Sequence, residues 1–249
     1  MAGNIFTPAN LRALAGFASS NVLLAFDYDG TLAPIAPTPE GARMRAATRR
    51  WLTRVAQRYP CVVISGRPLE DLEKRLDSIP VWYLFGNHGF EPHAGSDEHA
   101  ARARDWADRL SEQLPLEDGL IIEHKKYSVT VHYRRVRDKE RVMKAIVDAV
   151  RQLPDVRAVG GAQALNLLPS GGANKGVALQ QARAMFACHT VIYVGDDDTD
   201  EDAFASAPPD RLLSIRVGSR GPSRAKYRLR TQRDIDLLLQ HLLHFRATP

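Results

Sequence analysis

The chain has few cysteines, few aromatic residues and no long hydrophobic run. Its 249 residues include 2 cysteines, and aromatic residues make up 7%. Cys61 and Cys188 each lie at or near the start of an apolar run, and no metal-ligand spacing connects them. We therefore expect two reduced core cysteines, without a disulfide framework. No apolar stretch approaches the roughly 18 residues that a membrane-spanning helix needs, so we expect no membrane partner.

An excess of one charge is also missing, because 34 basic residues are interspersed with 29 acidic ones for a net charge of +5. The densest basic stretch, residues 216–230, contains only Tyr227 as an aromatic residue and lacks a base-stacking platform. We interpret it as a solvated edge or as a field that favours anionic substrates, and expect no nucleic-acid partner. Arg12 interrupts the apolar amino-terminal segment, so we expect no signal peptide and a cytoplasmic location.

Hydrophobic residues make up 44% of the chain and charged residues 25%, which is typical of a soluble globular protein. Strand-like runs alternate with helical patterns at both ends of the chain, and this alternation predicts an α/β core with a parallel sheet. The expected strands are 22–27, 61–64, 81–85, 191–194 and 212–217, and the expected helices are 40–58, 68–76, 174–187, 200–206 and 233–244.

The pattern changes in the middle of the chain, where two helices flank alternating strands. Helices are expected at 98–113 and 138–153, and strands at 120–123, 127–136, 156–160 and 163–168. Short strands of this kind favour antiparallel pairing. We therefore predict an α+β unit over 90–168, inserted between core segments 1–89 and 169–249.

The most informative motif is Asp27-Tyr28-Asp29-Gly30, which follows the apolar run 22–26. Strand alternation points Asp27 and Asp29 to the same side, at the carboxyl end of a buried strand. Two carboxylates this close need a cation or a shared proton. The alternative is a plain turn, in which Asp and Gly are also favoured.

A second acidic cluster follows the apolar run 191–194. Residues 196–202 contain five Asp and one Glu, which repel one another strongly when folded without a cation. The alternative is a solvated loop. Because carboxyl ends of parallel strands meet at one edge of a sheet, Asp196 and Asp200 are expected near Asp27.

Two further positions belong to the same edge. Ser65-Gly66-Arg67 follows the strand at 61–64, and Lys175 opens the helix at 174–187. Ser65 is interpreted as a donor to an anion or as a local cap of the next helix. Lys175 is interpreted as a stabilising charge near a helix start or as a solvated lysine.

In this order and spacing, these four motifs resemble those of the haloacid dehalogenase superfamily of phosphotransferases. Segments 26–35, 65–67 and 195–204, with 123–128 and 132–134 in the inserted unit, are similar to the trehalose-6-phosphate phosphatase family. The resemblance implies a Rossmann-like core with a parallel sheet and an inserted α+β cap of the C2 type. It also implies Mg²⁺ as the cofactor.

The resemblance implies specific roles for the core residues. Asp27 would attack phosphorus and form an aspartyl-phosphate, and Asp29 would serve as general acid and then general base. Mg²⁺ would be held by the Asp27 carboxylate, the Asp29 backbone carbonyl and the Asp196 carboxylate, with Asp200 orienting waters or Lys175. Lys175 would stabilise the charged intermediate, and Ser65, Gly66 and Arg67 would contact the phosphate end of the substrate.

In the cap, alternation along 127–135 places polar residues on one face. These are Ser128, Thr130, His132 and Arg134. This face is interpreted as a sugar-binding surface or as the solvent side of a half-buried sheet. The resemblance adds Glu123, Lys125 and His88 as substrate-binding candidates. The family commonly has Glu-x-Arg-Pro before the lysine, whereas this chain has Asn166 and Leu168, so Asn166 is expected to contact a sugar hydroxyl as a neutral amide.

The expected activity is hydrolysis of trehalose 6-phosphate to trehalose and phosphate. The alternatives are a phosphatase for sucrose 6-phosphate or glucosyl-3-phosphoglycerate, a mutase, or a non-catalytic subunit that binds a sugar phosphate. A small-molecule sugar phosphate is the expected partner, and a monomer or weak homo-oligomer the expected assembly.

Overall fold

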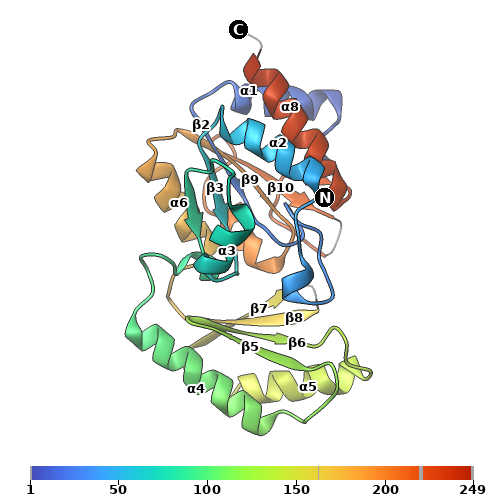
Figure 1. The fold of residues 1–249 in the computed structure, drawn as a ribbon, viewed down its shortest axis with the longest axis vertical. Coiled ribbons are helices and arrows are strands. Elements are labelled where there is room, and N and C mark those ends of the chain that lie inside the picture. Colours follow the sequence, from blue (N-terminus) through green and yellow to red (C-terminus); the bar gives the residue numbers. More distant parts are fainter. Residues whose placement is uncertain (1, 162, 219–220, 248–249) are drawn as a thin grey trace.

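The structure is a computed structural model, and it describes residues 2–161, 163–218 and 221–247. The molecule has two sheets in separate halves, one parallel with seven strands and one antiparallel with four (Figure 1). The parallel sheet is formed by the two ends of the chain and the antiparallel sheet by its middle. An α/β core with an inserted α+β unit, predicted from the sequence, is thus confirmed.

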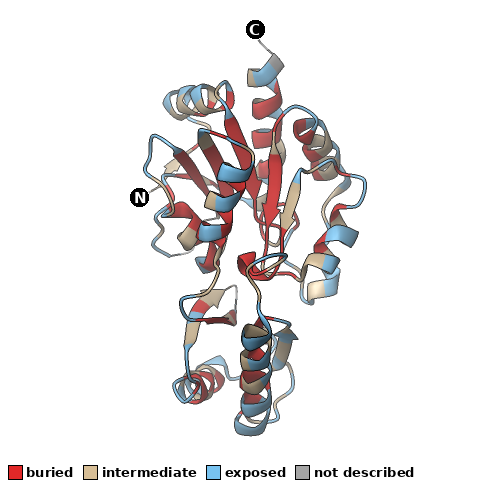
Figure 2. Ribbon diagram, turned by 90° about the vertical axis from the view of Figure 1, so that its left-hand side faces the viewer, coloured by how far each residue is buried: buried red, intermediate tan, exposed pale blue. Residues whose placement is uncertain are grey.

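The core sheet contains β1 (Gly3–Asn4), β2 (Val22–Phe26), β3 (Cys61–Ile64), β4 (Tyr83–Phe85), β9 (Thr190–Gly195), β10 (Leu212–Val217) and β11 (Tyr227–Leu229). Its order is β1-β11-β10-β9-β2-β3-β4, and every neighbouring pair is parallel. Strands β2, β3 and β10 are buried along their whole length (Figure 2), and in β2 and β3 the continuous apolar runs account for this.

Helices cover both faces of this sheet. One face carries α1 (Pro8–Ala18), α2 (Ala46–Ala56), α3 (Leu69–Leu76) and α8 (Ile235–Ala247), and the other carries α6 (Lys175–Met185) and α7 (Glu201–Phe204). Alternate residues of β2 divide between the two: Leu24 and Phe26 pack in the first layer, and Leu23 and Ala25 in the second. The strand that precedes the first acidic motif is therefore fixed from both sides.

The cap sheet contains β5 (Ile121–Lys125), β6 (Ser128–His132), β7 (Val156–Gly161) and β8 (Ala164–Pro169), in the antiparallel order β5-β6-β8-β7. Helices α4 (Asp97–Gln113) and α5 (Lys139–Val150) cover its outer face (Figure 1). Trp106 and Ile146 pack there against Val129 and Val131 of β6. The opposite, polar face of the sheet turns towards the core.

Short 3₁₀ helices lie at η1 (Pro39–Gly41), η2 (Asn87–Gly89), η3 (Asp198–Asp200) and η4 (Gln232–Asp234). The basic stretch is exposed at Arg224, Lys226 and Arg230, in agreement with its interpretation as a solvated edge, whereas Arg216 on β10 is buried. Arg216 donates to Glu201 at 2.5 Å and to Asp198 at 3.2 Å. Within the described ranges, no helix is both long and apolar enough to cross a membrane.

Candidate active site

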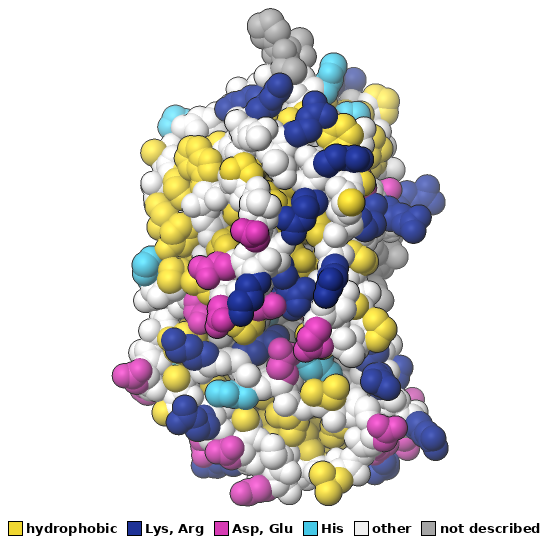
Figure 3. Space-filling model, viewed as in Figure 1, with side chains coloured by type: hydrophobic (Ala, Val, Ile, Leu, Met, Phe, Trp, Pro, Cys, Tyr) yellow, Lys and Arg dark blue, Asp and Glu magenta, His cyan; other side chains and the backbone are white. Residues whose placement is uncertain are grey.

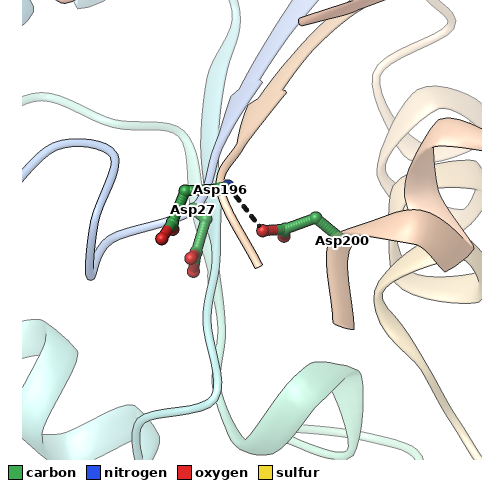
Figure 4. Close-up of side chains that lie close together, drawn as sticks. All are labelled: Asp27, Asp196 and Asp200. Atoms are coloured by element: carbon green, nitrogen blue, oxygen red, sulfur yellow. Dashed lines mark hydrogen bonds between the residues drawn. The ribbon is translucent and has the colours of Figure 1, made fainter. Parts of the chain in front are cut away.

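The two acidic motifs meet because β2 and β9 are neighbours in the sheet. Phe26 is in register with Val194, and the Asp27 backbone N–H donates to the Val194 carbonyl at 2.9 Å. Carboxylate oxygens of Asp27, Asp196 and Asp200 all lie within 4.8 Å of one another. Asp27 and Asp196 point the same way, and Asp200 approaches the backbone of Asp196 from the side (Figure 4).

Two glycines permit this approach. A Cβ at Gly30, which has a φ of 77°, would lie 2.1 Å from the Asp196 Oδ2. A Cβ at Gly195 would lie 2.3 Å from the Asp200 Cγ. Both loops therefore need glycine to bring their carboxylates together.

Asp200 is fully buried and accepts four hydrogen bonds. Its Oδ1 accepts from Lys175 Nζ and the Tyr193 hydroxyl, each at 2.7 Å. Its Oδ2 accepts from the backbone N–H groups of Asp196 at 2.8 Å and Asp197 at 2.9 Å. Because its lone pairs are engaged by protein donors, Asp200 organises the loop and holds Lys175 in place.

Lys175 is 2% exposed, which excludes the interpretation as a solvated lysine. It lies in the first turn of α6, and its Nζ is 3.1 Å from Asp27 Oδ1. Burial acts to lower its pKa, but the charges of Asp200 and Asp27 outweigh burial and raise it. Lys175 therefore remains a cation in direct contact with Asp27.

One lysine does not neutralise this acidic group. Burial raises the pKa of Asp27 to about 8, an effect that Lys175 opposes and the charges of Asp200 and Asp29 reinforce. Burial, followed by the charge of Asp27, raises the pKa of Asp196 well above its usual value. Closely spaced, desolvated carboxylate oxygens are the ligands that Mg²⁺ prefers, so the donor set fits this ion.

Asp29 forms a bidentate ion pair with Arg67. The guanidinium donates from Nε to Oδ2 at 2.6 Å and from Nη2 to Oδ1 at 2.7 Å. Its other contacts are the Asp71 carboxylate and the Pro39 carbonyl, each at 2.7 Å. Arg67 is buried with most of its donors used by protein, whereas the Asp29 side chain is 38% exposed. Arg67 therefore fixes the direction in which Asp29 faces.

Ser65 lies at the end of β3 with its hydroxyl near the backbone of the next turn. The Arg67 backbone N–H donates to Ser65 Oγ at 3.3 Å, a local contact within the turn, but Ser65 does not cap the next helix, because α3 begins at Leu69 with Pro68 as its N-cap. Ser65 and Gly66 also face the cavity described below, so this local contact and a contact with an anion are compatible.

A cavity of about 310 Å³ lies between the core and the cap. Charged side chains of both signs gather around this junction (Figure 3). Thirteen of the fifteen predicted site residues line it: Asp27, Asp29, Ser65, Gly66, Arg67, His88, Glu123, Lys125, His132, Arg134, Asn166, Lys175 and Asp196. The other two, Ser128 and Asp200, lie beside it and contact residues that support the site.

The cap contributes a polar wall, as the alternation along β6 predicts. Glu123 accepts from His132 Nε2 at 2.7 Å and lies 3.4 Å from Lys125 Nζ. Thr130 donates to Asn166 Oδ1 at 3.0 Å, so the amide nitrogen of Asn166 is the group left to face the cavity. The polar face of β6 is therefore turned to the site, and the solvent-side interpretation is wrong.

Hydrogen bonds between side chains and backbone groups join the cap to the core. Ser128 donates to Asn87 Oδ1 at 2.6 Å, and Asn87 Nδ2 donates to the Lys125 carbonyl at 3.3 Å. On other sides, Arg134 donates to the Ala36 carbonyl at 2.5 Å and Arg157 donates to Asp202 at 2.6 Å. Ser128 therefore fastens the cap and does not line the cavity.

Sequence reasoning missed several supporting residues, among them Asn87, Asp71 and Tyr193. Asn87 has a φ of 50°, and its place in the turn 86–89, where asparagine tolerates such a backbone, was the available signal. Asp71 lies in the first turn of α3, four residues after Arg67, and a spacing of four residues at a predicted helix start was the available signal. Tyr193 carried no signal, because a buried strand tyrosine is most often a core residue.

A parallel α/β core with these four motifs at one sheet edge, covered by an inserted α+β cap, defines a protein of the haloacid dehalogenase superfamily fold. Sequence comparison resolves the family within it. The profile described as trehalose-phosphatase matches residues 25–233, and the chain belongs to that family.

Individual relatives agree with this placement. The chain is similar to a trehalose-phosphate phosphatase of Mycobacterium avium strain 104, with 37% identity over 204 residues that cover 76% of this chain and 52% of the relative. A trehalose-phosphate phosphatase of Mycobacterium tuberculosis is 34% identical over 220 residues, covering 81% and 56%. The chain thus spans about half the length of the curated relatives it matches.

Among solved structures, the chain shares its fold with the C-terminal domain of C. albicans trehalose-6-phosphate phosphatase. The TM-score is 0.78 at 23% sequence identity, and the match covers 98% of each chain. The shared fold includes both sheets, because the match extends over nearly the whole of both chains.

Proposed function

We propose that this protein is a Mg²⁺-dependent phosphatase that hydrolyses trehalose 6-phosphate to trehalose and phosphate. The observation that carries the proposal is the group formed by buried Asp27, half-buried Asp196 and buried Lys175 beneath a polar cap wall. A nucleophilic carboxylate, a cation site and a fixed ammonium are the parts that phosphoryl transfer needs. We infer trehalose as the sugar from the trehalose-phosphatase family to which the chain belongs.

The Asp27 and Asp196 carboxylates would hold Mg²⁺, together with the Asp29 backbone carbonyl. When bound, the ion supplies charge neutralisation, so that a dianionic phosphate can approach the Asp27 carboxylate. Asp200 helps to position Asp27 and Asp196, because its hydrogen bonds fix the backbone of Asp196 and the ammonium of Lys175.

The reaction has two steps on Asp27. In the first, a carboxylate oxygen of Asp27 bonds to phosphorus, the bond from phosphorus to the sugar oxygen breaks, and Asp29 gives that oxygen its proton. In the second, Asp29 takes a proton from water, the water oxygen bonds to phosphorus, and the aspartyl-phosphate bond breaks to release inorganic phosphate. Between these two proton transfers Asp29 is ionised, and its ion pair with Arg67 holds it at the cavity wall.

The test is phosphate release from trehalose 6-phosphate, sucrose 6-phosphate, glucose 6-phosphate and glucosyl-3-phosphoglycerate, with and without Mg²⁺. We expect Mg²⁺-dependent turnover and a kcat/KM for trehalose 6-phosphate at least about tenfold above the others. Asp27→Asn should lower kcat by about 10³-fold or more, because it removes the nucleophile. Asp210→Asn, at an exposed position, is the control.

Other results would redirect the assignment. Equal rates on all four compounds would retain the phosphatase and remove trehalose as its particular sugar. No release from any compound would favour a non-catalytic protein that binds a sugar phosphate. Normal turnover by Asp27→Asn would show that another residue attacks phosphorus.

A further inference from the structure

A second arginine lies next to the ion pair of Asp29 and Arg67. Arg75, in the last turn of α3, donates from Nε to Asp71 Oδ2 at 2.7 Å. The same oxygen accepts from Arg67 Nη1 at 2.7 Å. Asp71 thus bridges two guanidinium groups, and the four side chains form an ion-pair network with two positive and two negative charges. Asp29, at one end of this network, is the proton donor and acceptor of the proposed reaction.

The ion-pair network packs on the residue between the two aspartates of the first motif. Tyr28 is buried, and its ring faces both guanidinium groups. The Arg67 Cζ lies 5.5 Å and the Arg75 Cζ 5.8 Å from the centroid of the ring. Cations in this position are attracted to the face of an aromatic ring. Tyr28 therefore holds the network against the backbone that carries Asp27 and Asp29.

The network also contacts the core segment that borders the cavity. Arg75 donates from Nη1 to the Ala42 carbonyl at 2.6 Å, and from Nη2 to the Pro39 carbonyl at 3.3 Å. The Pro39 carbonyl also accepts from Arg67 Nη2 at 2.7 Å. Both Pro39 and Ala42 line the cavity. The network therefore joins Asp29 to the cavity wall beside it.

Asp71 sets the orientation of the Arg67 guanidinium. This planar group donates from Nε and Nη2 to Asp29 and from Nη1 to Asp71. Burial acts to raise the pKa of Asp71, but hydrogen bonds from Arg75 and Arg67 outweigh burial and lower it, so the carboxylate is ionised. Because the donors of a guanidinium lie in one plane, the contact with Asp71 also fixes the direction of the two donors on Asp29.

We propose that Asp71 and Arg75 are positioning residues for proton transfer by Asp29. They act through Arg67, because Arg75 holds Asp71 and Asp71 holds the guanidinium that pairs with Asp29. This inference rests on the proposed function, in which Asp29 gives a proton to the leaving oxygen and later takes one from water. Without the network, Asp29 turns away from the reacting oxygens, and both proton transfers slow while the Asp27 nucleophile stays in place.

Two sugar-free substrates of similar size test this role. p-Nitrophenolate leaves phosphorus readily without a proton, whereas phenolate is more basic and benefits from a proton supplied by Asp29. Asp71→Asn should therefore lower kcat/KM for phenyl phosphate by about 30-fold, and for p-nitrophenyl phosphate by less than about threefold. The loss on trehalose 6-phosphate, whose leaving oxygen is more basic still, should be at least as large as on phenyl phosphate. Arg75→Gln should give the same pattern. Equal losses on all three substrates would overturn the proposal.

Helix α3 also provides a matched control. Glu70 and Lys74 form an ion pair with the same spacing of four residues, at 2.6 Å, but both side chains are exposed. Glu70→Gln and Lys74→Gln should each leave kcat/KM for every substrate within about twofold of the wild type. Losses as large as those of Asp71→Asn would show that the charge of the helix acts in general, and would contradict a specific role for Asp71 and Arg75.

The second proton transfer gives an independent readout. With p-nitrophenyl phosphate, Asp71→Asn should lower kcat by about tenfold or more and produce an initial burst of p-nitrophenolate. The reason is that the aspartyl-phosphate forms at a nearly normal rate and then waits for water that Asp29 activates slowly. A fall in kcat without a burst would place the defect in the attack by Asp27 and would contradict the proposal.

Binding without turnover separates positioning from loss of the site. In Mg²⁺-loaded Asp27→Asn protein, adding Asp71→Asn should change the Kd of trehalose 6-phosphate, measured by calorimetry, by less than about threefold. A loss of affinity as large as the loss of kcat/KM would show that Asp71 supports substrate binding instead. Absence of phosphate release from every phosphate ester by the wild-type protein would refute the proposed function itself. Should Asp71→Asn not fold, Arg75→Gln carries the same tests.

Discussion

The Asp200 carboxylate has no exposed surface, and its charge is tolerated because four donors converge on it. Two of these donors belong to the backbone that carries Asp196, and one is the ammonium that contacts Asp27. A residue without direct access to the cavity thus sets the positions of residues that have it.

Replacement of Asp200 by asparagine should destabilise the fold as well as the site. The amide cannot accept from four donors, and it leaves the buried Lys175 without its closest counter-charge. We expect the free energy of unfolding to fall by about 3–5 kcal/mol, measured by urea denaturation without added metal. Asp210→Asn, at an exposed position, should change it by less than about 0.5 kcal/mol. A loss below about 1 kcal/mol for Asp200→Asn would contradict this account.

At the residue scale, the sequence predicts groups that stand directly after buried strands. Asp27, Ser65 and Asp196 could be placed at one sheet edge, because parallel strands end on the same side. The bonds between those groups could not be predicted. Whether Arg67 contacts a substrate or Asp29 depends on side-chain geometry across a sequence separation of 38 residues, which no local pattern encodes.

At the scale of elements, β5 and β6 of the cap present a polar edge to the core. Lys125 is the fifth residue of β5, its ammonium lies near Glu123, and its backbone carbonyl accepts from Asn87 of the core. The next residue, Lys126, is exposed and lies over the Tyr127 ring. Lys125 ends β5 and Lys126 lies in the turn that follows, so the two adjacent lysines have different surroundings.

This arrangement predicts different effects for the two lysines. Lys125→Ala should raise KM for trehalose 6-phosphate by about tenfold or more, with a much smaller effect on p-nitrophenyl phosphate, because the lost contact is with the sugar side of the substrate. Lys126→Ala is the matched control and should leave both substrates unchanged. A similar change in KM for both substrates would remove Lys125 from the sugar site.

Some elements were predicted at or near their observed bounds, whereas the helix expected at 40–58 is shorter, at Ala46–Ala56, and the shortest strands were not predicted. Strand β3 was placed at its observed bounds, and helix α4 was expected one residue after its observed start. In contrast, β1 and β11 have two and three residues, too few to show an alternation. Helix α1 has signals that were available, since Thr7 caps it and Pro8 opens it.

At the scale of the whole molecule, both cysteines lie inside the core. Cys61 begins β3, next to the edge strand β4, Cys188 precedes β9, and each side chain is buried. Burial raises the pKa of the Cys61 thiol far above its usual value, and it also raises that of Cys188. Both thiols are therefore protonated and inaccessible in the native protein.

Thiol modification therefore reports opening of the core. We expect negligible reaction with a disulfide reagent at pH 8 in the native state and 2 thiols per chain in denaturant. The rate in intermediate urea should follow the unfolding rate measured by circular dichroism. Rapid native-state labelling of either cysteine would show that this part of the core opens locally.

The order of strands in the core sheet has a consequence for biosynthesis. Strand β2, which carries Asp27 at its end, lies between β3 and β9, and β9 begins at Thr190. On the ribosome, β2 is made early but lacks one neighbour until most of the chain has emerged. The cap strands and helices, by contrast, are contiguous in sequence and pair with one another. The inserted unit can thus fold while the nascent core is still incomplete, and the late arrival of β9 both closes the sheet and brings Asp196 beside Asp27.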